Sequence, residues 1–489
     1  MTSTPEIDRP GTQPSRKQSE PELEGSMTTF DIVFTVLAFN APLAVFIGYL
    51  TVIIGYANGL GTPITLLAAG ALVFIFAAGF TAMSKHLPNP GAFYAYVTAG
   101  LGKPLGLGAA FLAIISYVFL YTSSFIYGGT SLSALVSDVF NGPDIKWWVF
   151  NIILIVIVAV LGYFRITLSA RILTVAMIFE VVVIVVYNAV VFAQGGSEGL
   201  TGSSFNPDNI FSGSLGLAAL YGLGMFSGFE ATAIFREEAR DPDRTIPRAT
   251  YIMIGVITAL YAITSYALIV GIGPSKAVET TAADPTGTAL GSIDQYLGST
   301  VQDIVIVLLC SSIFAAILSM HNITARYLFS MGRDGVFHRA LGKVHPTHGS
   351  PYMASAFTTV IAVVFLVVVL ITKADNLTVY ARLAGIALYA LIMLLLMTSA
   401  AIFMYFRARP GHGLGAWKTV VSPILAGIGF IGALILATQN ADFLVGGSKS
   451  AATILIVIFF ATVAVGAAYA VVLKRSRPDV YARIGRQDV

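Results

Sequence analysis

Long apolar stretches separated by short polar breaks occupy most of the chain. A bilayer core about 30 Å thick needs roughly 20 apolar residues in a helix that rises about 1.5 Å per residue. Apolar windows of about this length recur about twelve times. We therefore predict membrane-spanning helices over residues 31–57, 63–85, 106–136, 146–164, 168–193, 214–234, 249–273, 301–331, 353–372, 379–406, 419–438 and 451–473.

The amino-acid composition agrees with a membrane protein. Of the 489 residues, 56% are hydrophobic and 11% are charged, whereas soluble domains carry about 25% charged residues. The mean hydropathy is +0.82, so the chain has too little polar surface for a water-exposed body, and the lipid bilayer is its predicted surrounding. The net charge of +3 gives no reason to expect a nucleic-acid partner. Because Cys310 is the single cysteine, an intramolecular disulfide and a cysteine zinc site are excluded.

The polar segments divide the chain into two tails and one membrane domain. Residues 1–26 are rich in Pro, Ser and Glu and are predicted to be a disordered cytoplasmic tail. The membrane domain covers residues 27–475, and residues 476–489 form a second cytoplasmic tail. No cleavable signal peptide is predicted, because the first apolar run is already long enough to span the bilayer.

Basic residues indicate the orientation of the predicted spans. Cytoplasmic loops of membrane proteins accumulate Lys and Arg. With about twelve spans, 23 of the 28 basic residues lie on the side of the two termini and five on the other side. An odd number of spans would mix the two groups. Both termini are therefore predicted to be cytoplasmic in a multi-pass protein of the plasma membrane.

Two of the predicted spans contain stretches that disfavour a continuous helix. The first span holds Phe39-Asn40-Ala41-Pro42, and the sixth holds the glycine-rich run from Gly222 to Phe229. Each alone is compatible with a tolerated kink, because Pro and Gly are common in membrane helices. The two breaks lie five spans apart, however, and repeats of five spans must insert in opposite orientations. This is the inverted-repeat plan in which discontinuous helices meet around a substrate.

Two carboxyl groups lie well inside predicted spans: Glu180 in the fifth and Glu230 in the sixth. A carboxylate within the membrane is costly unless it is neutral, paired or hydrated. Glu180 lies about 13 Å beyond Arg171 on a helical rise, and it is our candidate proton-coupling residue. The structural alternative is a permanently protonated carboxyl bonded to a backbone carbonyl. Glu230 is predicted either to accept N–H groups freed by the breaks or to titrate during transport.

Several motifs resemble those of the amino acid, polyamine and organocation permease superfamily. The sixth span and its sequel read Ser227-Gly228-Phe229-Glu230, Glu237-Glu238-Ala239-Arg240-Asp241-Pro242 and Arg244-Thr245-Ile246-Pro247-Arg248-Ala249. The end of the eighth span reads Arg326-Tyr327-Leu328-Phe329-Ser330-Met331-Gly332-Arg333-Asp334-Gly335, followed by Gly349-Ser350-Pro351. The resemblance covers about residues 28–475.

The resemblance implies an all-α integral membrane protein with a leucine-transporter-like core of five plus five spans. The first repeat would cover about 28–193 and the second about 212–406, with two peripheral helices in about 419–473. The substrate's amino group would meet carbonyls at both breaks, and its carboxylate would meet amides of the first break. Carried over to this sequence, the substrate-binding positions are Phe39, Asn40, Ala41, Pro42, Phe226, Ser227, Gly228 and Phe229. Glu180 matches a position at which several relatives place a lysine or carboxylate, which favours a proton gradient over sodium.

One feature departs from the pattern of the superfamily. Many members have a Gly-Ser-Gly-like run at the first break, whereas this chain has Asn40-Ala41-Pro42-Leu43. Proline supplies no amide to a carboxylate. The sequence therefore predicts a secondary active transporter for an amino acid or related amine, by symport or antiport, and leaves a polyamine or organic-amine carrier open.

Tyr117 and Tyr121 in the third span lie four residues apart on one helix face and are candidate gate residues. No nucleotide-binding loop, metalloprotease motif or catalytic constellation is present, so an enzyme is not predicted and no cofactor or metal is expected. A channel would need a continuous polar pore that the sequence does not indicate. The last two spans are candidates for a homodimer contact.

Overall fold

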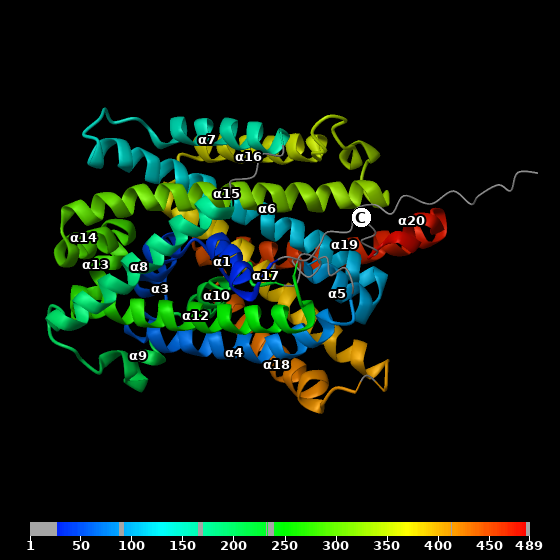
Figure 1. Cartoon of the computed structure of the whole chain (residues 1–489), viewed down its shortest axis with the longest axis horizontal. Helices are drawn as coiled ribbons and strands as arrows, with labels where there is room; N and C mark the ends of the chain where they lie inside the picture. Colours follow the sequence, from blue (N-terminus) through cyan, green and yellow to red (C-terminus); the bar gives the residue numbers. More distant parts are fainter. Residues whose placement is uncertain are drawn as a thin grey trace, which may run out of the picture.

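The computed structural model describes residues 27–87, 92–164, 170–230, 232, 239–411 and 413–485, without the side chains of 38, 39, 92 and 170–174. Within these residues the regular structure is helical, apart from an isolated parallel bridge between Met27 and Ala239. The long helices lie side by side in one elongated bundle (Figure 1). The predicted N-terminal tail, residues 1–26, lies outside the described residues.

The first half of the chain forms the helices up to the end of the fifth predicted span. They are α1 (Thr29–Asn40), α2 (Pro42–Ala44), η1 (Val45–Leu50), α3 (Thr51–Tyr56), η2 (Gly59–Gly61), α4 (Thr62–Ser84), α5 (Ala92–Leu101), α6 (Lys103–Ala134), η3 (Leu135–Val139), α7 (Trp147–Tyr163) and α8 (Ala170–Gln194).

The second half begins with short helices and continues with six long ones. They are η4 (Ser203–Phe205), α9 (Pro207–Ile210), α10 (Leu215–Gly224), α12 (Pro242–Ile272), α13 (Ala277–Ala283), α14 (Pro285–Leu297), α15 (Ser299–Asp334), η5 (Arg339–Gly342), α16 (Tyr352–Thr372), α17 (Asn376–Arg407), η6 (Trp417–Val421), α18 (Ser422–Gln439), η7 (Phe443–Val445), α19 (Lys449–Ser476) and α20 (Pro478–Arg483).

The described helices are those of a multi-pass membrane protein. Nine are long and apolar enough to cross a membrane, or ten when the bent pair at the start of the chain is counted as one span. Val360, Val364 and Val368 form an exposed stripe along α16, as expected for a helix face in contact with lipid. The shorter apolar helices α7 and α10 lie within two further predicted spans. The total of about twelve spans stays a prediction.

The seventh span begins earlier than the sequence analysis predicted. Its predicted apolar window starts at about residue 249, whereas α12 starts at Pro242 and continues through Pro247. Proline at the first position of a helix is favourable because its missing N–H would have no partner there. Pro247 removes one further hydrogen bond close to this end of the helix, where the cost is compatible with a long apolar continuation.

Both predicted breaks interrupt their helices in the structure. α1 ends at Asn40, Ala41 has a φ of 52°, and α2 begins at Pro42; the two parts of this span are bent by 42°. α10 ends at Gly224, and turns continue to Glu230, with a φ of 95° at Gly228. The continuation of the sixth span lies mostly outside the described residues.

The bundle has two distinct ends, the terminal face and the opposite face. The terminal face carries α5 and α20, at the right of Figure 1, and the opposite face carries α9, α13 and α14, at its left. At the terminal face Lys103 Nζ donates to the carbonyls of Tyr481 and Ala482, at 2.9 and 2.6 Å. The described part of the predicted C-terminal tail therefore packs against the start of α6.

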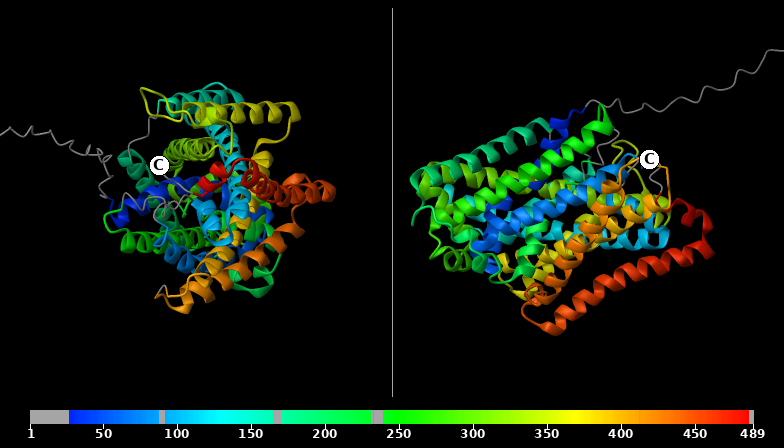
Figure 2. Two further views of the ribbon diagram at one scale, coloured as in Figure 1. Left: turned by 90° about the vertical axis from the view of Figure 1, so that its right-hand side faces the viewer. Right: turned by 90° about the horizontal axis from the view of Figure 1, so that it is seen from below.

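The last helices lie at the periphery. α19 runs along one side of the bundle in Figure 2, and most of its surface is exposed. α6 and α17 lie in the interior and pack extensively against each other. They are the two helices that pass beside both cavities described below.

Candidate functional site

The two helix breaks are joined directly by one side chain. Asn40 Nδ2, at the end of α1, donates to the carbonyl of Met225 at 2.6 Å. Asn40 Oδ1 accepts a hydrogen bond from the hydroxyl of Tyr261 on α12. Proline and glycine at the breaks leave backbone groups without helical partners, and such groups need partners inside a membrane protein. Asn40 supplies one of these partners and fixes the distance between the breaks.

A small cavity lies between the breaks and three scaffold helices. Its volume is about 60 Å³, comparable with the space of about two water molecules and well below the roughly 300 Å³ of a typical ligand pocket. A substrate therefore requires the surrounding helices to move apart. The cavity is lined by Asn40, Ala41, Ala44, Val45 and Tyr49 of the first span, Gly224, Met225 and Ser227 of the sixth, and Leu120, Ser124, Tyr127, Ile313, Ala316, Met320 and Tyr380 of α6, α15 and α17.

The structure divides seven of the eight predicted substrate-binding residues into two groups. Asn40, Ala41 and Ser227 line the cavity. Buried nearby, but not part of its described lining, are Pro42, Phe226, Gly228 and Phe229. The side chain of Phe39 lies outside the described residues. The substrate contacts themselves stay a prediction.

The Phe229 side chain belongs to an aromatic cluster between α4 and α5. Its ring centroid lies 5.9 Å from that of Phe76, 5.6 Å from that of Phe80 and 6.3 Å from that of Phe93. Edge-to-face contacts of this kind stabilise a packed interior. The side chain of Phe229 is therefore part of the packed interior, and its role in substrate binding stays a prediction.

Glu180 lies where three elements meet. Its Oε2 accepts hydrogen bonds from the backbone N–H of Leu43 at 3.2 Å and from the hydroxyl of Ser312 at 3.0 Å. Leu43 is the first residue of α2 with an N–H group, because Pro42 has none. A carboxyl group at a helix N-terminus is electrostatically favourable. The side-chain carboxyl of Glu180, on α8, thereby links the first break to α15.

Glu230 joins the second break to α6. Its Oε1 accepts a hydrogen bond from the Tyr117 hydroxyl at 2.9 Å, and its Oε2 accepts one from the Gly228 N–H at 3.0 Å. The Gly228 N–H is one of the backbone groups freed by the break, so this contact agrees with the predicted structural role. Whether Glu230 titrates during transport stays a prediction.

The two candidate gate residues are bonded to the scaffold, and neither belongs to the described cavity lining. Tyr117 is bonded to Glu230. The Tyr121 hydroxyl lies 2.9 Å from His321 Nδ1, and His321 Nε2 lies 2.8 Å from the Ser355 hydroxyl. These two hydrogen bonds connect α6, α15 and α16 in the buried interior. The gating role of Tyr117 and Tyr121 remains untested.

Four other tyrosines form a cluster beside the cavity. Tyr49, Tyr127 and Tyr380 line it, and Tyr221 contacts Tyr49. The rings of Tyr127 and Tyr380 stack with centroids 4.6 Å apart and an interplanar angle of 16°. The ring centroid of Tyr49 lies 6.0 Å from that of Tyr380 and 6.0 Å from that of Tyr221. The Tyr221 hydroxyl also donates to the carbonyl of Ala381 at 2.6 Å, which holds α10 against the start of α17.

The sequence offers Tyr127 as a possible cavity-lining residue and Ser312 as a possible partner in an interhelical hydrogen bond, but it does not pair either with Tyr380 or Glu180. Tyr127 and Ser312 were visible as polar positions in apolar spans, but local spacing does not show which other span each side chain faces. A search for tyrosines at similar predicted depth in the first, third and sixth spans would have grouped Tyr49, Tyr127 and Tyr221, but not Tyr380, which is the second residue of its predicted span.

Comparison with known proteins agrees with this geometry. The amino acid permease family profile matches residues 29–461. The chain is 26% identical over 354 residues to the branched-chain amino acid permease BcaP of Bacillus subtilis, covering 69% of this chain and 73% of that protein. It is 24% identical over 345 residues to the low-affinity putrescine importer PlaP of Escherichia coli, covering 68% and 73%. The chain therefore belongs to the amino acid permease family, whose members are transporters and not enzymes.

Proposed function

We propose that this protein is a proton-coupled carrier that moves an amino acid across the plasma membrane by alternating access. The relatives named as amino acid permeases support this substrate class. The cavity between the breaks supports the mechanism, because unwound carbonyls attract an ammonium group and helix N-termini attract a carboxylate. A zwitterion matches this arrangement once the helices separate.

The orientation is part of the proposal. The side of the termini holds 23 of the 28 basic residues, and cytoplasmic loops are enriched in Lys and Arg. Arg407 at the end of α17 and Lys474 in the last turn of α19 are examples. The terminal face would then be cytoplasmic and the opposite face extracellular.

The observation that carries proton coupling is the position of Glu180. Its carboxyl bonds to the N–H of Leu43 on one side and to the hydroxyl of Ser312 on the other. Movement of the first span relative to α15 would break one of these contacts and admit water. A buried carboxyl is costly when charged and unpaired, so its protonation would change together with the conformation. This linkage is what a proton-coupled carrier requires.

Replacement of Glu180 by glutamine tests the coupling. Proteoliposomes with the wild-type protein should accumulate radiolabelled leucine under an inward proton gradient, whereas Glu180→Gln should permit only equilibration. Glu279→Gln, an exposed change on α13, is the control and should accumulate like the wild type. Replacing sodium by choline should leave uptake unchanged. Gradient-driven accumulation by Glu180→Gln at the wild-type level would remove Glu180 as the coupling residue.

A polyamine or organic-amine carrier is the second candidate. Pro42 has no N–H, and the N–H of Leu43 is bonded to Glu180, so the first two positions of α2 offer no amide to a substrate carboxylate. The relative named as a putrescine importer agrees with this alternative.

Counterflow distinguishes the two substrate classes. Vesicles preloaded with unlabelled leucine or putrescine are diluted into the labelled solute, and transient accumulation is measured. Counterflow of leucine alone supports the amino acid carrier, and counterflow of putrescine alone replaces it by the amine carrier. A linear flux without saturation or counterflow would contradict both and indicate a channel.

A further inference from the structure

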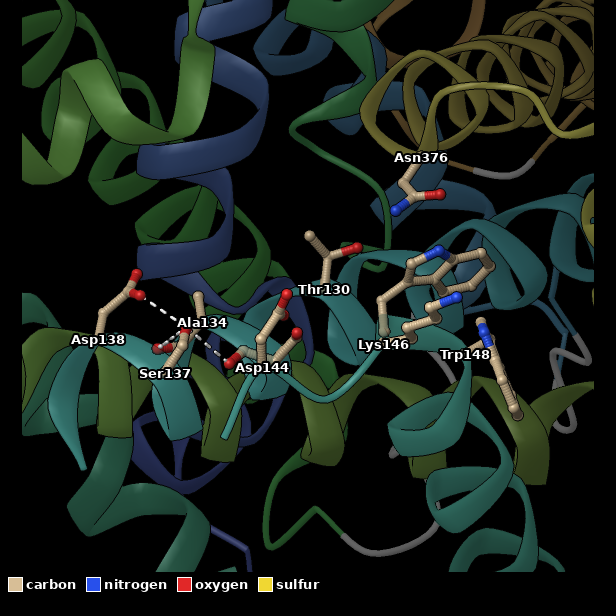
Figure 3. Close-up of a pocket in the computed structure, with 10 residues that line it drawn as sticks. Thr130, Ala134, Ser137, Asp138, Asp144, Lys146, Trp148 and Asn376 are labelled. Carbon is tan, nitrogen blue, oxygen red and sulfur yellow. Dashed lines mark hydrogen bonds between the residues drawn. The ribbon is translucent and has the colours of Figure 1, made fainter. Parts of the chain in front are cut away.

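A second and larger cavity lies at the opposite face, outside the site described above. Its volume is about 430 Å³, within the range of about 300–1,000 Å³ that holds small ligands. It lies between the end of α6 with η3, the segment leading into α7, and the start of α17 (Figure 3). Its lining residues are Thr130, Ser133, Ala134, Ser137, Asp138, Asp144, Lys146, Trp147, Trp148 and Asn376.

The charged groups of this outer pocket lie on different sides of it. Figure 3 shows Asp138 and Asp144 on one side, and Lys146, Trp148 and Asn376 on the other. Among the described residues, neither carboxylate nor Lys146 forms an ion pair. Their charges are therefore free to meet those of a ligand.

Hydrogen bonds hold the walls of the outer pocket in place. The Ser133 hydroxyl donates to the carbonyl of Ile145 at 2.6 Å, which fixes the segment before α7 to the end of α6. The Ser137 hydroxyl donates to Asp138 Oδ1 at 2.6 Å and orients that carboxylate. These hydrogen bonds hold the end of α6, η3 and the segment before α7, and Asn376 at the start of α17 completes the lining.

The outer pocket is one helical turn away from the central cavity along two helices. On α6, Thr130 lines the outer pocket and Tyr127 lines the central cavity. On α17, Asn376 lines the outer pocket and Tyr380 lines the central cavity. Residues three or four apart lie on the same face of a helix. The stacked rings of Tyr127 and Tyr380 therefore separate the two spaces.

We propose that the outer pocket is a second binding site, which holds an amino acid at the entrance before the stacked tyrosines separate. Asp138 and Asp144 bind the ammonium group, and Lys146 and the Asn376 amide bind the carboxylate. Trp147 and Trp148 contact the side chain and provide aromatic faces, which attract cations. The proposal rests on the proposed transport of an amino acid and adds a site that the two helix breaks do not form.

The tryptophans of the chain provide a direct readout of this site. The chain has three tryptophans, and the third, Trp417, lies in η6 near the terminal face. In a Trp417→Phe background all tryptophan emission comes from the outer pocket. Titration with leucine should change this emission saturably.

Two matched double variants show whether the carboxylates are responsible. Adding Asp138→Asn and Asp144→Asn should raise the leucine concentration for half-maximal emission change roughly fivefold or more. This is expected from the loss of the ion pairs with the ammonium group. Asp208→Asn with Glu279→Gln removes the same charge from exposed positions of α9 and α13 on the same face, and should keep the response. Equal responses of the two double variants, or none in the Trp417→Phe background, would overturn the proposal.

Lys146→Gln tests the carboxylate contact. It should weaken leucine binding and strengthen putrescine binding, because it removes a cation that attracts a carboxylate and repels a second ammonium group. An emission change with putrescine alone would overturn the assignment to an amino acid.

Uptake measurements separate this proposal from the transport proposal. In proteoliposomes, Asp138→Asn with Asp144→Asn should raise the leucine concentration for half-maximal uptake and preserve the maximal rate. An emission response without any uptake in the wild type would contradict the transport proposal and leave the outer site standing. Normal uptake without an emission response would contradict the outer site and leave the transport proposal standing.

Discussion

Glu180 and Glu230 are both buried carboxyls near the helix breaks, yet their partners differ in kind. Glu180 forms hydrogen bonds with groups on two other elements, α2 and α15, both of which contribute to the lining of the central cavity. Glu230 bonds to a neighbouring N–H of its own break and to Tyr117 on α6. The first arrangement suits a group whose surroundings change during transport. The second suits a group that holds the break in one shape.

Replacements of Glu230 should separate these two roles. The side chain of glutamine can accept a hydrogen bond from the Gly228 N–H through its oxygen. It can donate a hydrogen bond to the Tyr117 hydroxyl through its NH₂ group. Glu230→Gln should therefore preserve stability and proton-driven accumulation, unlike Glu180→Gln. Glu230→Leu leaves both partners unpaired and should lower the free energy of unfolding by about 1–3 kcal/mol. Thermal unfolding in detergent and gradient-driven uptake measure the two effects. A folded Glu230→Gln variant without coupled accumulation would assign proton coupling to Glu230.

At the scale of the helices, the sequence predicted what local chemistry determines. The apolar window 63–85 corresponds to α4 (Thr62–Ser84) and the window 451–473 to α19 (Lys449–Ser476), because helix ends in a membrane follow the change from apolar to polar residues. The two breaks were also predictable. Pro42 and the glycines around residue 224 act on the backbone within their own turn, so no distant contact is needed to locate them.

The conformation of the second break leads to a prediction about Gly228. Its φ of 95° is one that residues with a side chain rarely adopt. Gly228→Ala should therefore lower the free energy of unfolding by about 1–3 kcal/mol and reduce the uptake rate. Gly222→Ala is the control, since a Cβ there would lie 3.6 Å from its nearest neighbours, an ordinary contact, within helix α10. Thermal unfolding of both variants checks this, and equal effects would show that the strain at Gly228 is unimportant.

At the scale of the whole molecule, the sequence could not supply the pairings between spans. Asn40 meets Met225 across 185 positions, and Glu180 meets Leu43 across 137. A hydrophobic window gives the position of a helix and says little about the neighbour that each face contacts. The inverted-repeat plan suggested that the breaks meet, but it did not identify Ser312, the four tyrosines or the outer pocket. Those depend on how the helices are rotated and staggered in the bundle.

The attachment of α19 gives a prediction at this largest scale. α19 packs on α6 through two glycines: a Cβ on Gly466 would lie 2.7 Å from Gly108 Cα, and a Cβ on Gly108 would lie 2.6 Å from the Val463 carbonyl. Small residues allow this close approach of membrane helices. Gly466→Leu should push α19 away from α6 and lower the midpoint of thermal unfolding.

Transport should survive this displacement, because the cavity residues on α6 begin at Leu120, about 18 Å along the helix from Gly108. The concentration of leucine for half-maximal uptake should therefore stay at the wild-type value. Gly432→Leu on α18 is the matched control, since no atom lies within 4 Å of a Cβ at that position, and it should change neither quantity. A Gly466→Leu variant with normal stability and impaired uptake would show instead that α19 takes part in the transport cycle, which its peripheral position does not suggest.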